Sequence, residues 1–185
     1  IKMGGGNDNL HLSATGSGKN FIFGDGGNDS IYLAAALGAS DLVDGGAGTD
    51  TLKLAAATFT NIVKGVENLS VSGATTANFT SVDSALAIAD SGQAAVTFTN
   101  LKNGSSYTSS LDKTGAISLS FASGQAATLN VSADAGIDDR LTLANVATPT
   151  LTIGASTTTN TMDTISVDSI ATSLTVNATA SNQDL

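Results

Sequence analysis

The chain of 185 residues is acidic and poor in bulky side chains: 16 Asp and Glu outnumber 7 Lys and Arg, the formal net charge is −9, and aromatic residues make up only 4%. This balance argues against nucleic-acid binding, which needs a basic surface, and no apolar run approaches the ~20 residues that span a bilayer. The absence of Cys excludes disulfides and thiolate metal sites and is compatible with an oxidising exterior. We expect a thin fold that stacks small and β-branched residues in layers.

Three gapless copies of a nine-residue pattern, Gly-Gly-x-Gly-x-Asp-x-U-x with U a large aliphatic residue, open the chain. They occupy residues 3–11, 24–32 and 45–53, and degenerate copies lie between them at 15–23 and around 41–43. The sixth positions of the copies alternate in spacing between 12 and 9 residues. They are Asp8, Asn20, Asp29, Asp41 and Asp50. This alternation predicts a coil of 21 residues with two turns and two short strands, in which each U side chain points into the core.

The chemistry of the repeat suits a hard cation. Glycine tolerates tight turns whose carbonyls point inward, and Ca²⁺ takes roughly 6–8 oxygen ligands, which carbonyls and carboxylates of two stacked turns can supply. We therefore predict one Ca²⁺ ion between Asp8 and Asp29 and another between Asp29 and Asp50. On the opposite edge, Asn20 stacked over Asp41 predicts a poorer site. Because stacked carboxylates repel each other without metal, we expect ion binding to drive folding.

These repeats resemble the RTX family, the calcium-binding β-rolls of bacterial proteins exported by type I secretion. The resemblance covers residues 3–53; the segment 45–52 matches fully, whereas Met3 and Asp25 stand where the family has glycine. It implies that the aspartate carboxylates and the main-chain carbonyls of the turns bind Ca²⁺, and that the chain folds only outside the low-calcium cytosol. The turn residues concerned are Gly4, Gly6, Gly24, Gly26, Gly27, Gly45, Ala47 and Gly48.

A less specific resemblance concerns the setting of the repeats. The segment 45–52 leading to 66–73, in a chain rich in Thr, Ala and Ser, is similar to RTX-containing surface-layer proteins. That resemblance implies a secreted structural protein at the bacterial cell surface, in which calcium rigidifies the monomer and drives lattice self-association. Two alternatives stay open: a spacer module of a type I-secreted adhesin, and the calcium-dependent tail of a secreted protease or lipase whose active site lies elsewhere.

Beyond the repeats the glycines become sparse. Residues 55–68 predict a connector, either a loop or a short helix, since apolar residues at 59, 62, 63 and 66 have helical spacing. Residues 69–185 contain short runs with a period of two, which predicts strands with one buried face. They are centred near residues 70, 87, 97, 119, 130, 142, 152, 166 and 175.

Two architectures compete for residues 69–185. A β-sandwich would suit the short strand spacing, and Asn103-Gly104 is a hairpin signal. However, alternate strands recur at 21–24 residues, for example 97 with 118, 130 with 152, and 152 with 175. We therefore favour an all-β, right-handed parallel β-roll or solenoid with two short strands per coil. Its calcium-rich part would span 1–54, and the continuation 69–185 would be mostly free of metal.

The remaining candidate residues are acidic residues outside the sixth positions of the repeats and the sole histidine. Asp134, Asp138 and Asp139 lack partner glycines, so Asx turns are favoured over a further calcium site. Asp25 and Asp44 could ligate an ion or simply be solvated. His11 is the sole histidine and follows an aliphatic position, so we expect it to face solvent, and we expect no catalytic residue and no enzyme activity. Because the chain begins at Ile1 and ends within the pattern, we expect it to be part of a longer protein.

Overall fold

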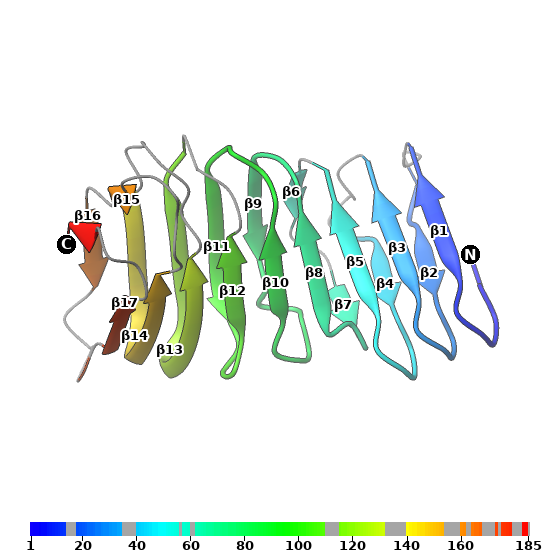
Figure 1. Cartoon of the computed structure of the whole chain (residues 1–185). Coiled ribbons are helices and arrows are strands. Elements are labelled where there is room, and N and C mark those ends of the chain that lie inside the picture. Colours follow the sequence, from blue (N-terminus) through cyan, green and yellow to red (C-terminus); the bar gives the residue numbers. More distant parts are fainter. Residues whose placement is uncertain are drawn as a thin grey trace.

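The fold is a parallel β-solenoid, as predicted (Figure 1). The computed structural model describes the chain except for residues 14–17, 35–39, 56, 60–61, 110–114, 132–139, 154–159, 162–163, 168–172, 174, 179–182 and 185. The described residues are all-β without a helix, and every strand pairing among them is parallel. The antiparallel sandwich considered for residues 69–185 is therefore wrong.

One face of the solenoid is a continuous run of strands from the N-terminal coil onward. Its members are β1 (Asn9–Leu12), β3 (Ser30–Leu33), β5 (Thr51–Leu54), β8 (Asn68–Val71), β10 (Ala87–Asp90), β12 (Ser106–Ser109), the ends of β13 (Ile117–Val131) and β14 (Arg140–Ile153), and β17 (Thr175–Ala178). The strands β13 and β14 are long enough to belong to both faces, because their first residues pair on the opposite side.

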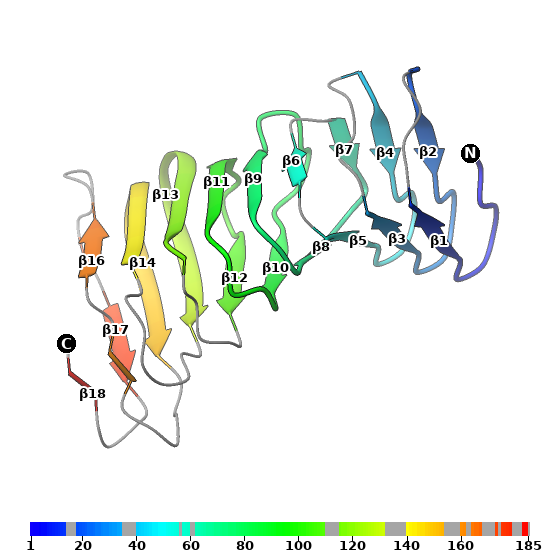
Figure 2. The ribbon, with the colours of Figure 1, turned by 90° about the horizontal axis from the view of Figure 1, so that it is seen from above.

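The opposite side consists of two strand columns, which both have a strand in the coil between β5 and β8, and the two layers are seen edge-on in Figure 2. The first group is β2 (Phe21–Phe23), β4 (Leu42–Asp44) and β7 (Ile62–Lys64); the second is β6 (Ala57–Phe59), β9 (Thr75–Asn78), β11 (Val96–Leu101), the starts of β13 and β14, and β16 (Thr164–Val167). A short separate pair joins β15 (Asn160–Thr161) to β18 (Gln183–Asp184).

The register confirms the 21-residue coil in the first part of the chain. Leu10 pairs with Ile31, and Ile31 pairs with Leu52. The next coil is shorter, because Leu52 pairs with Leu69. Successive parallel strands lie ~4.8 Å apart, so each coil places its turn directly against the turn of the coil before it.

The later coils have the recurrence that the sequence predicted, with one correction. Thr97 lies opposite Ser118, and Asn130 lies opposite Thr152. However, Thr152 lies opposite Asn177 rather than Thr175, so this coil is two residues longer than predicted. A shift of two keeps the same side chains on the same face of the sheet, so the strand alternation alone does not reveal it.

The segment 55–68 differs from its prediction. The strands β6 and β7, of three residues each, lie in it, and the helix suggested by its apolar spacing is absent from its described residues. Phe59 and Val63 are buried, but they serve two different strand columns, since β6 pairs with β9 and β7 pairs with β4. Asn103-Gly104 likewise forms a turn within a coil, not a hairpin, because β12 pairs with β10 and β13.

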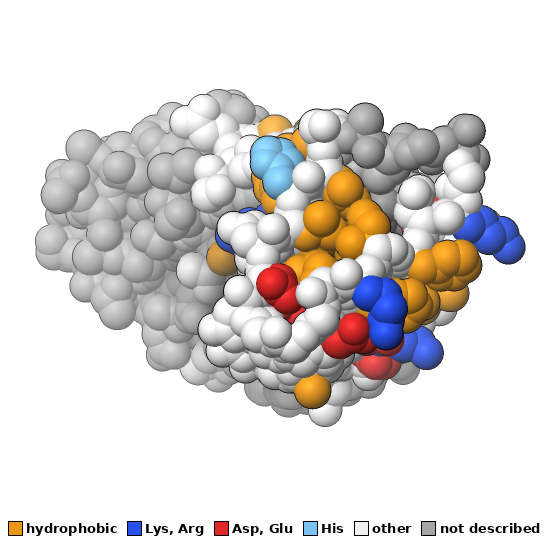
Figure 3. All heavy atoms as spheres, turned by 90° about the vertical axis from the view of Figure 1, so that its right-hand side faces the viewer, with side chains coloured by type: hydrophobic (Ala, Val, Ile, Leu, Met, Phe, Trp, Pro, Cys, Tyr) orange, Lys and Arg blue, Asp and Glu red, His pale blue; other side chains and the backbone are white. Residues whose placement is uncertain are grey.

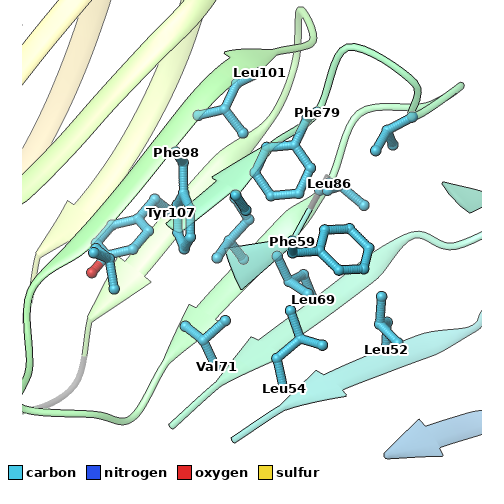
Figure 4. Packing of buried hydrophobic residues seen from close by; sticks show 14 of the residues in the cluster. Leu52, Leu54, Phe59, Leu69, Val71, Phe79, Leu86, Phe98, Leu101 and Tyr107 are labelled. Carbon is cyan, nitrogen blue, oxygen red and sulfur yellow. The ribbon is translucent and has the colours of Figure 1, made fainter. Parts of the chain in front are cut away.

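The core is a thin layer between the two faces. Aliphatic side chains at the U positions beyond the first repeat are buried, including Ile22, Ile31 and Leu52. Further along, four of the eight aromatic residues form one row (Figure 4). The row is Phe59, Phe79, Phe98 and Tyr107, and the ring centroids of its neighbours lie 6.5, 5.6 and 6.2 Å apart. Offset and edge-to-face contacts at such distances are favourable, so these rings stabilise the coils that follow the glycine turns.

At the N-terminal end, hydrophobic side chains gather beside acidic and basic ones (Figure 3). Met3, Leu10 and Leu12 are partly buried there against the core. In the part of the chain that the structure describes, no helix is long and apolar enough to cross a membrane.

Candidate metal centre

The turns that precede β1, β3 and β5 share one backbone conformation, which explains their glycines. The second residue of each turn has positive φ: 100° at Gly4, 71° at Asp25 and 97° at Gly46. The fourth residue also has positive φ, at Gly6, Gly27 and Gly48. Glycine adopts this conformation at no steric cost, and Asp is among the few other residues that tolerate it. The departure from glycine at Asp25 therefore leaves the turn intact.

The first and third turn residues differ in how much space they have. A Cβ atom at Gly24 would overlap the carbonyl oxygen of Gly45 and Oδ2 of Asp29, and one at Gly45 would overlap the carbonyl of Gly65 and approach Oδ2 of Asp50. A Cβ atom at Gly26 would meet nothing within 4 Å, which explains why Ala47 is accepted at the equivalent position. Each tight glycine thus faces a carboxylate oxygen of its own repeat and a carbonyl oxygen of the next coil.

The three repeat aspartates stack along one edge, as predicted. The backbone N–H of Asp8 donates to Oδ1 of Asp29 at 2.8 Å, and the N–H of Asp29 donates to Oδ1 of Asp50 at 2.7 Å. Asp29 and Asp50 are only 2% and 1% exposed. The second oxygen, Oδ2, is buried without a hydrogen-bond partner in all three residues. Buried oxygens of this kind are costly unless something compensates them.

The electrostatics of this edge are unfavourable without a counter-charge. Burial raises the pKa of Asp50 above its ordinary value of 3.8; the hydrogen bond from Asp29 N–H opposes the rise, and the charges of Asp29, Glu67 and Asp44 reinforce it. Like charges held close together disfavour ionisation. The surroundings of Asp50 therefore disfavour the ionised form of its carboxyl group.

Main-chain carbonyls of the turns fall into two groups. Those of Gly4, Gly26 and Ala47 accept hydrogen bonds from the backbone N–H of Gly26, Gly6 and Gly27 in the adjacent coil. The carbonyls of Gly6, Gly27 and Gly45 instead fill the space that a Cβ atom would need on Gly27, Gly48 and Gly24. Of the second group, the carbonyl of Gly45 lies beside the stacked aspartates, because this carbonyl and Oδ2 of Asp29 flank Gly24.

Two functional features of this edge were not found from the sequence. Asn28 N–H donates to Oδ1 of Asn7 at 2.7 Å, and Thr49 N–H donates to Oδ1 of Asn28 at 2.9 Å, so the fifth positions form an amide ladder beside the aspartates. Its signal was the recurrence of Asn at 7 and 28. The other feature is Glu67, whose Oε2 accepts the N–H of Asp50 at 2.8 Å. Its only signal was the run Glu67-Asn68-Leu69, which has an acid two residues before a buried aliphatic residue.

The opposite edge has a different character. Asn20 stacks on Asp41 as predicted, but both its backbone N–H and its side-chain Nδ2 donate to Oδ1 of Asp41, at 2.6 and 3.2 Å. Asp41 is buried, and unlike the repeat aspartates it has no unpartnered oxygen. At this edge, the backbone and side-chain N–H groups of Asn20 therefore satisfy the Asp41 carboxylate oxygen that a cation would otherwise contact.

The other candidate residues are placed as follows. His11 is exposed, as expected, and contacts the ring of Tyr32 edge-to-face at 4.4 Å. Asp25 pairs with Lys2 at 3.4 Å on the surface, and Asp44 is half-buried. Asp134, Asp138 and Asp139 lie outside the described residues.

The donor set fits a cation that prefers oxygen ligands. Within the described ranges, no three side chains of His, Cys, Asp or Glu form a group that could hold a metal ion by themselves. The turns instead offer unpartnered carboxylate oxygens together with carbonyls. Carboxylates and backbone carbonyls are the ligands that Ca²⁺ takes. Comparison with known proteins gives no match, either to a family model, to a curated protein or to a solved structure.

Proposed function

We propose that this chain is a calcium-binding structural module whose first coils fold on ion binding. The observation that carries the proposal is the stack of three aspartates, two of them buried, each with one buried oxygen that lacks a partner. Two ions would be held, one between Asp8 and Asp29 and one between Asp29 and Asp50, with turn carbonyls completing the ligand set. Bound Ca²⁺ supplies positive charge to the carboxylate column.

The chain's own residues prepare this site in three ways. The backbone N–H groups of Asp8 and Asp29 orient one carboxylate oxygen of the next coil, which leaves Oδ2 for the ion. The tight glycines let a carbonyl approach the same point. The aliphatic U positions behind the turns keep the strands in register. Because these parts come from successive coils, the site exists only when the coils are stacked, and binding is thereby coupled to folding.

The biological setting is proposed from the resemblance to RTX-containing surface-layer proteins: a secreted bacterial protein in which calcium drives folding and lattice assembly. The acidic, cysteine-free composition and the repeated solenoid architecture support a structural role. In the full-length protein, we expect calcium-dependent sheets by negative-stain microscopy. Calcium-dependent folding without sheets would favour an adhesin spacer or an enzyme tail instead.

The calcium proposal is tested by circular dichroism and thermal melting of the chain in EGTA and after addition of CaCl₂. We expect β-structure and the melting temperature to rise on calcium addition. An unchanged spectrum and melting temperature in EGTA would contradict the proposal, because the carboxylate column would then be stable without a cation.

A further inference from the structure

The repeat aspartates end at Asp50, but the carboxylate column continues for one more coil. Asp50 N–H donates to Oε2 of Glu67, as Asp29 N–H donates to Oδ1 of Asp50 and Asp8 N–H to Oδ1 of Asp29. Glu67 is the only glutamate in the chain. It stands where the spacing shortens from 21 to 17 residues, so the longer side chain occupies the position of the next repeat's aspartate.

The oxygens around this last step repeat those of the step before it. At Gly24, the carbonyl of Gly45 and Oδ2 of Asp29 flank the glycine; at Gly45, the carbonyl of Gly65 and Oδ2 of Asp50 do so. Oδ2 of Asp50 is unpartnered in a side chain that is 1% exposed. This step of the column therefore contains a buried, unpartnered oxygen on Asp50 as well as the two neighbouring carboxylates of Asp50 and Glu67.

The segment that carries Glu67 is firmly attached to the turn before β5. Gly45 N–H donates to the carbonyl of Lys64 at 2.9 Å, and the N–H groups of Glu67 and Asn68 donate to the carbonyl of Asp50 at 3.3 and 3.0 Å. Glu67 is partly buried by this packing. The carbonyl of Gly65 and the carboxylate of Glu67 are thus positioned by backbone hydrogen bonds on both sides.

We propose that Asp50, Glu67 and the carbonyl of Gly65 form a third cation site, which ends the ion column outside the repeat motif. The proposal rests on the calcium function above. It also changes which aspartates matter most: Asp29 and Asp50 each serve two ions, whereas Asp8 serves one within the described coils.

The test counts ions on the full chain by native mass spectrometry and isothermal titration with CaCl₂ after chelation. Glu67→Gln keeps a hydrogen-bond acceptor for Asp50 N–H but removes the charge, and we expect it to bind one ion fewer than the parent chain. The control is Asp83→Asn, which removes a charge from an exposed acid outside the column and should bind as many ions as the parent. An equal ion count and affinity for Glu67→Gln would overturn the third site.

A second measurement does not depend on how well Glu67→Gln folds. The calcium concentration at half-maximal folding is measured by circular dichroism for Asp8→Asn, Asp29→Asn and Asp50→Asn. The third site predicts that Asp29→Asn and Asp50→Asn raise this concentration by similar factors, both larger than that of Asp8→Asn. If only Asp29→Asn stands out, the column ends at Asp50 and the two-ion proposal alone survives. If the parent chain binds no calcium, both proposals fail.

Discussion

Two regions of this solenoid bury carboxylates to the same extent and compensate them differently. In the glycine-rich coils, Asp29 and Asp50 each keep an oxygen without a partner. In the later coils, Asp90 is 2% exposed, and its oxygens accept the hydroxyl of Tyr107 at 2.7 Å and the N–H of Gly92 at 2.9 Å. The comparison shows that the fold can satisfy a buried acid with its own donors. The repeat aspartates have no such donor at Oδ2, and this difference is the reason for proposing a bound cation there.

The same two regions differ in what holds neighbouring coils together. The first has turns with positive φ, close carbonyl contacts and small side chains. The second has the row of aromatic rings from Phe59 to Tyr107. Apolar burial stabilises without any ligand, so stability of the second region should depend little on calcium.

The largest expected effect is on the glycine-rich coils when calcium is removed. Hydrogen exchange followed by mass spectrometry should show loss of amide protection in residues 9–54 on addition of EGTA, with a smaller change in residues 87–109, because local stability follows local contacts. Magnesium should not restore protection, since Mg²⁺ demands a smaller octahedral site and gives up its waters reluctantly. Equal loss of protection in both regions would contradict the prediction that the second region is stable without calcium.

Replacing one turn glycine by alanine should lower stability at a tight position and leave it nearly unchanged at an open one. Gly24→Ala places Cβ against the carbonyl of Gly45 and against Asp29, so we expect a loss of about 1–3 kcal/mol or more in calcium-saturated unfolding. Gly26→Ala is the matched control, because its Cβ meets nothing and Ala47 occupies the equivalent position. Similar urea midpoints for the two variants would show that the close contact at Gly24 is not a constraint.

In the later coils, removing one hydroxyl should weaken the fold whether or not calcium is present. Tyr107→Phe deletes a donor to buried Asp90, which costs about 1–3 kcal/mol. Tyr32→Phe, at a half-buried position on β3, serves as the control and should change stability much less. Urea unfolding with and without EGTA measures both. A Tyr107→Phe effect that vanishes in EGTA would couple the two regions instead of separating them.

The smallest effect concerns pH in the absence of calcium. Because the pKa of Asp50 is raised in the folded state, its ionisation opposes folding above that pKa, and the penalty disappears as pH falls toward 3.8, its ordinary value. The calcium-free chain should therefore gain β-structure between neutral pH and about pH 4, as followed by circular dichroism, and Asp50→Asn should gain less. A steady loss of structure over this range in the parent chain would show that other carboxylates dominate.

Much of the first region was predictable from the sequence because its information is local and periodic. The 21-residue spacing of Asp8, Asp29 and Asp50 determines which residues stack, and a positive-φ turn restricts the residue types that the repeat can use. The amide ladder at Asn7 and Asn28 has the same period, but the repeat accepts any residue at its fifth position, so the pattern by itself predicts no contact there.

What only the tertiary structure decided lies where coil length changes. The pairing of Leu52 with Leu69 shortens one coil, brings Glu67 against Asp50, and places β6 and β7 in a segment whose apolar spacing also suited a helix. The contact between Asp90 and Tyr107 likewise joins residues with no shared motif. A periodic sequence determines the repeat of a solenoid, because each coil has the same local sequence pattern. The points where that period changes depend on which side chains the neighbouring coils bury together.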